Sequence, residues 1–144
     1  AYKEYNQIIL KRGEEEHLSY AYSINLGSQE IPEAEFIVIL TQASKETIEQ
    51  KNEKMYTKYI DYDKIKGRLQ IRTRMPHDYI ATKEGTKKLK KLFIDDKVPK
   101  SQRDTLPLIA DGNEIIWIVG GRLNTNYYIT EETKTLLEIQ IIFK

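Results

Sequence analysis

The chain has 144 residues, enough to bury one sizeable core or two small lobes that share one. Its composition, 40% hydrophobic and 31% charged, excludes a disordered protein, and the lack of cysteine excludes disulfide bonds and thiolate metal sites. The net charge of +1 conceals a basic block, because residues 67–106 carry eleven Lys and Arg against five Asp and Glu while both flanking parts are acidic. Such a block is typical of a face that binds a polyanion, and a solvated surface with acidic partners elsewhere explains the charges equally well.

The first half of the chain predicts β-structure. Residues 5–10 are rich in Tyr and Ile, and residues 18–26 alternate large apolar with small or polar side chains, the pattern of a half-buried strand. Turns are expected around Gly27-Ser28 and Ile31-Pro32. Further strands are expected over residues 36–40 and 56–62, and the polar segment 43–54 between them predicts a loop or a weak helix. Short strands at this close spacing indicate a β-sandwich.

The second half predicts mixed structure. A strand is expected over residues 69–72 and a turn over 75–78. A helix is expected from Thr86, whose hydroxyl can cap it, to Phe93 or Asp95. Its buried stripe would be Leu89, Leu92 and Phe93. The opposite face would carry Lys87, Lys88, Lys90 and Lys91.

The rest of the chain predicts one further helical turn and two strands. The turn is expected over residues 101–105, opened by Pro99, and the strands over 115–119 and 136–143, with a tight turn at Gly120-Gly121. Composition changes most at 65–67, which predicts a β-rich N-terminal lobe (1–66) and a second lobe (67–144) within one compact domain. The fold class predicted is therefore α+β, mainly β, with a lysine-rich helix.

Signals for catalysis, metal binding and membrane insertion are weak in this sequence. His17 and His77 have no metal-ligand spacing, and no nucleotide-binding or nucleophile motif occurs. Asp95-Asp96 could hold Mg²⁺, but paired acids at a helix end are common on surfaces. No apolar run is long enough to span a bilayer and no secretory leader is visible, so we expect a cytoplasmic protein. The start at Ala1 rather than at Met suggests a fragment of a longer protein.

Signals for nucleic-acid binding are stronger. Arg68, Arg72 and Arg74 alternate along one predicted strand, where their guanidinium groups could bind phosphate oxygens bidentately. The helix lysines, with Lys97, Lys100 and Arg103, would extend this surface. Contacts of this kind read the backbone and shape of RNA rather than its sequence. A solvated helix explains the lysines alone as easily, but it explains the three arginines less well.

At this point the sequence resembles a known family, the C-terminal domain of bacterial tRNA(Ile)-lysidine synthetase. The resemblance is carried by an ordered series of elements: Arg72-Thr73-Arg74, Gly85-Thr86-Lys87-Lys88-Leu89-Lys90, Pro99-Lys100-Ser101-Gln102-Arg103-Asp104 and Gly120-Gly121-Arg122. It is close over residues 68–128 and looser over the earlier strands.

The resemblance implies a β-sandwich of the type found in phenylalanyl-tRNA synthetase, which contacts tRNA towards its acceptor stem. In this family a separate N-terminal domain uses ATP, Mg²⁺ and lysine to make lysidine at the wobble cytidine of tRNA(Ile). That domain carries a Ser-Gly-Gly-x-Asp-Ser loop, which this sequence lacks. The resemblance thus implies a fragment without a catalytic residue, cofactor or metal of its own, whose partners are tRNA(Ile) and that N-terminal domain. The residues it points to as tRNA contacts, with the neighbouring basic positions, are Arg72, Arg74, Lys87, Lys88, Lys90, Lys91, Lys97, Lys100, Arg103 and Arg122.

A second hypothesis remains open on the sequence alone. The tyrosine-rich first half could form a protein-interaction or dimerisation module, with the lysines serving solubility. Phosphate binding weakens steeply with salt and an apolar interface does not, so salt dependence separates the two.

Overall fold

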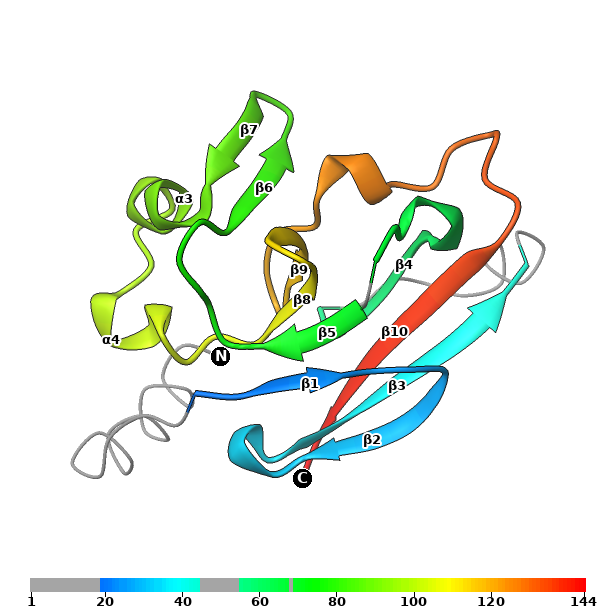
Figure 1. Ribbon diagram of the computed structural model, residues 1–144, viewed down its shortest axis with the longest axis horizontal. Helices are drawn as coiled ribbons and strands as arrows, with labels where there is room; N and C mark the ends of the chain where they lie inside the picture. Colours follow the sequence, from blue (N-terminus) through cyan, green and yellow to red (C-terminus); the bar gives the residue numbers. More distant parts are fainter. Residues whose placement is uncertain (1–18, 45–54, 68) are drawn as a thin grey trace.

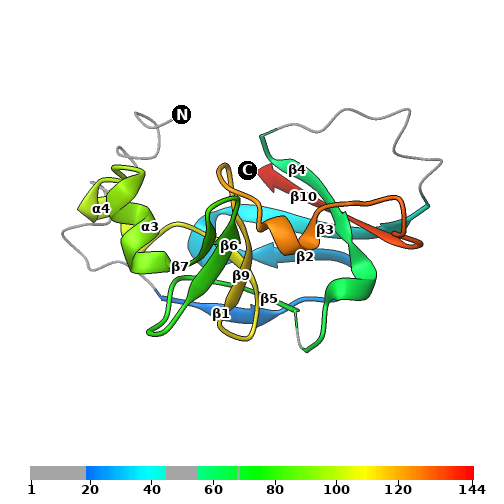
Figure 2. The same ribbon diagram turned by 90° about the horizontal axis from the view of Figure 1, so that it is seen from above.

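The computed structural model describes residues 19–44, 55–67 and 69–144. Within these ranges two β-sheets pack against each other around a shared apolar core, and the two α-helices lie together at one end of the molecule, on the left in Figures 1 and 2. This two-sheet, mainly β architecture confirms the predicted fold class.

The larger sheet has six strands in the order β1-β5-β8-β9-β6-β7. Neighbouring strands are antiparallel except β6 and β9, which pair in parallel through Tyr79 and Glu114. The central strands β8 and β9 are almost continuously apolar because both of their faces are covered. Ile109 faces the second sheet, whereas Leu108 and Ala110 face the helices. The six strands are β1 (Ala21–Ser23), β5 (Leu69–Arg72), β6 (Tyr79–Thr82), β7 (Gly85–Lys88), β8 (Leu108–Asp111) and β9 (Glu114–Ile118).

The smaller sheet has four strands in the order β2-β3-β10-β4. They are β2 (Gly27–Ile31), β3 (Phe36–Ala43), β4 (Thr57–Asp61) and β10 (Leu136–Phe143). β10, red in Figure 1, pairs with β3 along its whole length and with β4 on its other side. Its alternate residues Leu137, Ile139 and Ile141 point into the core, as the period of two in this segment requires.

Each sheet contains strands from both halves of the chain. β1, from the first half, lies at the edge of the larger sheet, and β10, from the second half, lies inside the smaller one. The predicted lobes 1–66 and 67–144 therefore do not coincide with the two sheets. The shared core joins Phe36 and Ile60 to Ile71 and Trp117, so neither sheet buries its inner face without the other.

Short helices connect the strands. The α-helices are α3 (Leu89–Asp95) and α4 (Lys100–Arg103), and the 3₁₀ helices are η1 (Pro32–Ala34), η2 (Tyr62–Lys64) and η3 (Thr125–Tyr127). Leu89, Leu92 and Phe93 are buried against the larger sheet while Lys90 is exposed, which confirms the predicted helix faces. Pro99 immediately precedes α4, as predicted. No helix in the described ranges is long and apolar enough to cross a membrane.

The predicted start of the first α-helix is wrong. Thr86 lies in β7 and caps nothing; α3 begins at Leu89 after Lys88, which makes no side-chain capping bond. Residues 79–88 instead form a hairpin, because the Thr82 hydroxyl bonds within the turn and Gly85 adopts a φ of 112°, a value that favours glycine. Lys87 and Lys88 therefore belong to a strand, and only Lys90 and Lys91 of the four predicted helix lysines lie on α3.

The remaining differences concern the first half of the chain. The turn predicted around Gly27-Ser28 lies slightly earlier, as a bend at Leu26, and both predicted turn residues belong to β2. The strand predicted over 18–26 shortens to β1. β3 and β4 match the predicted strands closely, and the turn predicted after Ile31 is η1. The strand predicted over residues 5–10 and most of the loop predicted over 43–54 lie outside the described residues.

Candidate nucleic-acid interface

Five exposed lysines surround α3 and define what we call the basic surface: Lys88, Lys90, Lys91, Lys97 and Lys100. They occupy the end of β7, the solvent face of α3, the α3–α4 connection and the first residue of α4. None of their ammonium groups forms an ion pair with an acid in the described part of the chain. The end of the molecule where α3 and α4 lie side by side (Figures 1 and 2) thus presents several positive charges that no acid of residues 19–44, 55–67 or 69–144 pairs with.

Arg72 is not part of this surface, which corrects the prediction that it binds phosphate. Its side chain is 1% exposed and forms a bidentate ion pair with the Asp78 carboxylate, at 2.8 and 2.9 Å. The two terminal nitrogens also donate to the carbonyl oxygens of Thr73 and Gly112, whereas the buried Nε has no partner among the described residues. A phosphate could reach this guanidinium only if the interior opened, so Arg72 is a scaffold residue. Arg68 lies outside the described residues.

The three remaining predicted arginines lie at the surface with protein partners. Arg74 donates from Nε to Asp104 at 2.7 Å, and its guanidinium lies 5.9 Å from the centroid of the Phe93 ring. Arg122 holds Asp96 through two hydrogen bonds of 2.6 and 2.7 Å, and these bonds lower the pKa of the Asp96 carboxyl below its usual range. Because a guanidinium has five N–H donors, both arginines keep donors that a phosphate could accept.

Arg103 and Lys87 are also tied to their surroundings. Arg103 donates from Nε to the carbonyl of Val98 at 2.9 Å, and the next residue, Asp104, pairs with Arg74. Lys87 lies 3.4 Å from Glu84 and 3.6 Å from Asp95, with 22% of its side chain exposed. These contacts make Lys87 and Arg103 weaker candidates for RNA contact than the five lysines of the basic surface.

One polar cluster was missed by the sequence reasoning. The Glu114 carboxylate accepts hydrogen bonds from the side chains of Asn124, Asn126 and Tyr127, which fixes the segment around η3 against β9. Burial and the neighbouring Glu114 charge raise the pKa of the Tyr127 hydroxyl well above its ordinary value. The two asparagines flanking Thr125 are a usable signal, because the Asn124 side chain accepts from the backbone N–H of Asn126 as in an Asx turn.

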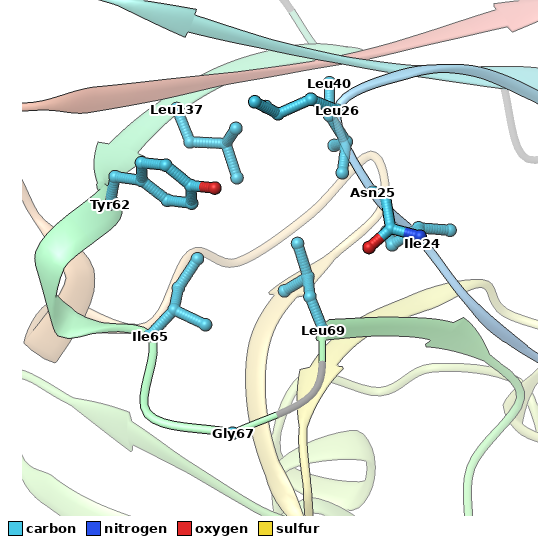
Figure 3. Close-up of a pocket in the computed structure, with 9 residues that line it drawn as sticks. All are labelled: Ile24, Asn25, Leu26, Leu40, Tyr62, Ile65, Gly67, Leu69 and Leu137. Atoms are coloured by element: carbon cyan, nitrogen blue, oxygen red, sulfur yellow. The ribbon is translucent and has the colours of Figure 1, made fainter.

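One apolar hollow in the described structure lies away from the basic surface. A cavity of about 630 Å³ opens between the sheets, walled by apolar side chains such as Leu26, Ile65, Leu69 and Leu137 (Figure 3). Tyr62, from η2, directs its hydroxyl into it, and η2 lies at the opposite end of the molecule from α3 (Figures 1 and 2). Within the described ranges no group of three acidic or histidine side chains could hold a metal ion, and Asp95 and Asp96 each meet a cation instead.

Comparison with known proteins identifies a family whose model matches this chain. Residues 69–140, half of the chain, match the family model described as "TilS substrate C-terminal domain". The chain is 42% identical over 91 residues to the tRNA(Ile)-lysidine synthase of Caldanaerobacter subterraneus subsp. tengcongensis, covering 62% of this chain and 20% of that protein. It is 32% identical to the enzyme of the same name from Clostridium acetobutylicum over 98% of this chain and 32% of that protein. The chain thus spans about a fifth to a third of these relatives.

A solved structure has the same fold. It is titled "Crystal structure of TILS C-terminal domain" and superposes with a TM-score of 0.68, covering 88% of this chain and 98% of the other at 21% sequence identity. The likeness extends over both sheets, well beyond the segment that the family model matches.

Proposed function

The chain belongs to the TilS substrate C-terminal domain family. We therefore propose that it is the part of a tRNA(Ile)-lysidine synthase that binds tRNA and does not catalyse the reaction. The curated relatives are three to five times longer than the stretch they share with this chain, which leaves room for a catalytic domain elsewhere in the protein. On this proposal ATP, Mg²⁺ and lysine are bound by that other domain, and the protein acts on tRNA in the cytoplasm.

The observation that carries the proposal is the basic surface. Five lysines without acidic partners in the described ranges lie within thirteen residues along the chain, on a frame of one hairpin and two short helices. Ammonium groups placed this way release counterions from a phosphate backbone when they bind it, which supplies affinity that carries little sequence information. We propose that they contact the tRNA body on its acceptor-stem side, and that Arg74 and Arg122 add contacts at the margins.

The proposal assigns discrimination between tRNAs to the rest of the enzyme. Double-stranded RNA hides its base edges in a deep, narrow major groove, so a surface of lysines reads shape and backbone. The isoleucine tRNA would then be selected mainly by the domain that meets the anticodon, and this domain would bind tRNAs of the same stem geometry with similar affinity.

The rival function, a protein-interaction or dimerisation module, has one observation in its favour. The apolar cavity of Figure 3 could receive a side chain from a partner, and it lies away from the basic surface. Binding of this kind would be insensitive to the loss of the lysines around α3.

A charge-matched pair of variants tests the proposal. Replacing Lys88, Lys90, Lys91 and Lys100 with alanine should weaken tRNA binding by about 10- to 100-fold at low salt, because four phosphate contacts are lost. Lys97 is left in place because its backbone already lies in the left-handed region, with a φ of 57°, so that the variant changes no residue at a strained position. The control variant replaces four lysines away from α3: Lys58, Lys64, Lys66 and Lys134.

The two variants lose the same net charge, so they separate local contact from general attraction. Binding is measured by filter retention, with circular dichroism to show that both variants are folded. Equal losses in the two variants would contradict a localised site, and no loss in the first would favour the protein-interaction function.

A further inference from the structure

Buried groups hold the turn between β5 and β6, while Met75, Pro76 and His77 at its tip are exposed. The buried Asp78 carboxylate accepts the Met75 N–H at 2.7 Å and the Asn113 side-chain amide at 3.1 Å, besides holding Arg72. Asn113 also donates to the carbonyl of Pro76, and its own carbonyl accepts the Tyr79 N–H. The path of the turn is therefore set by groups that do not involve its exposed side chains.

The residue at the tip of this turn is in an unusual conformation. His77 has a φ of 74°, in the left-handed region where a residue with a Cβ is disfavoured and glycine is not. Its imidazole is exposed and makes no hydrogen bond within the described part of the chain. The surrounding network therefore holds the His77 backbone in a costly conformation that presents the ring to solvent.

Tyr79 directly follows the same turn, and its side chain is partly exposed. It is 38% exposed, whereas Ile80 and Ala81, which follow it in β6, are buried. Its hydroxyl has no hydrogen-bond partner, and its ring meets no other aromatic ring, among the residues that the structure describes. More than a third of this side chain therefore remains open to solvent, with its hydroxyl available to a ligand.

The same side chain borders the basic surface. Tyr79 is the direct antiparallel partner of Lys88, so the two side chains project from the same face of the hairpin, with Cβ atoms about 5 Å apart. Lys88 is the first lysine of the basic surface and is followed at once by α3. Ile80 packs with α3, so Tyr79 and Lys88 lie on the other face of the hairpin from that helix. An RNA backbone that runs from α3 across β7, the edge strand of the sheet, would pass beside the Tyr79 ring.

We propose that Tyr79, flanked by Lys88 and His77, is a stacking platform for an unpaired base at the end of an RNA stem bound on the basic surface. An aromatic ring accepts any base because every base has a π face, and a neighbouring ammonium can neutralise the adjoining phosphate. A single exposed ring among cations and polar groups suits one nucleotide, whereas a stable protein interface needs a far larger contiguous area. The inference rests on the proposed function and extends it from phosphate contacts to one base.

The test compares two RNAs on the 144-residue chain. One is a short hairpin with a single-stranded 3′ extension, and the other is the same hairpin with a blunt end. We expect the extended RNA to bind about 5- to 100-fold more tightly, the range expected for one stacked base. Tyr79→Ala should abolish this preference while leaving blunt-hairpin binding unchanged, and Tyr79→Phe should retain it, since the ring and not the hydroxyl stacks.

Tyr128→Ala provides the matched control, because Tyr128 is 42% exposed and lies outside the turn. It should keep the full preference for the extended RNA. Equal binding of both RNAs by the unaltered chain, or a preference that survives Tyr79→Ala, would overturn the stacking inference and leave the proposed phosphate contacts standing. Failure of the unaltered chain to bind either RNA would contradict the proposed function as well.

Discussion

Asp78→Ala should lower the free energy of unfolding by about 3–5 kcal/mol, one of the two largest effects that we expect in this domain. The substitution leaves the Arg72 guanidinium, 1% exposed, without its counter-charge in the interior. It also removes the acceptor for the Met75 N–H and for the Asn113 amide, so the whole β5–β6 turn loses its support. The measurement is urea-induced unfolding followed by circular dichroism.

Asp104→Ala is the matched control for this prediction. It also removes a carboxylate that is paired with an arginine, but the Arg74–Asp104 pair is 29% and 45% exposed and should contribute at most about 1 kcal/mol. If Asp78→Ala cost no more than Asp104→Ala, the burial of Arg72 and its role as a scaffold residue would be contradicted.

Phe93→Ala should cost a similar 3–5 kcal/mol, by a different mechanism. The ring is 1% exposed and packs with Leu89, Leu92 and Ile115 between α3 and the larger sheet, and its removal leaves a cavity that short elements on both sides cannot easily close. The same truncation at the next residue, Ile94→Ala, should change the free energy of unfolding by less than about 0.5 kcal/mol, since Ile94 is 53% exposed. A larger loss at Ile94 than at Phe93 would reverse the assignment of the helix faces.

Local patterns predicted several elements well. The alternation or continuous apolar character of residues 36–40, 56–62, 69–72 and 136–143 places β3, β4, β5 and β10, because each pattern reflects which faces of a strand are buried. The Leu89, Leu92 and Phe93 spacing predicts the buried side of α3 for the same reason. In these segments the physical cause acts within a few residues, so the sequence alone is informative.

The β6–β7 hairpin shows where local patterns are insufficient. β7 is Gly-Thr-Lys-Lys, which has no apolar residue to mark a strand, and the lysine run joins smoothly to the helical pattern that follows. Its strand conformation depends on pairing with β6 and on the Thr82 turn, contacts that periodicity does not reveal. The helix was therefore extended three residues too far towards the N-terminus.

Arg72 shows a second limit of local patterns: they do not tell which face of a strand is buried. The predicted strand over 69–72 is present as β5, but it ends at Arg72, so Arg74 lies beyond it. The alternation of arginines also could not say whether the Arg72 side of the strand faced water or protein. The Asp78 carboxylate supplies the counter-charge that the buried guanidinium needs. This pairing depends on the turn of residues 73–78, which places Asp78 next to Arg72. The strand exchange that places β10 between β3 and β4 is likewise a long-range arrangement that composition cannot supply.

The central claim, that the lysines around α3 bind the backbone of tRNA, is tested most directly by a salt series. The association constant of the 144-residue chain for a tRNA is measured at increasing salt and plotted as log K against log salt concentration. Each phosphate contact contributes about 0.7–0.9 to the magnitude of the slope, so the five lysines of the basic surface alone predict a slope of about −3.5 to −4.5. Contacts from Arg74 and Arg122 would make the slope steeper. A slope near zero would contradict the claim and would indicate an apolar interface instead.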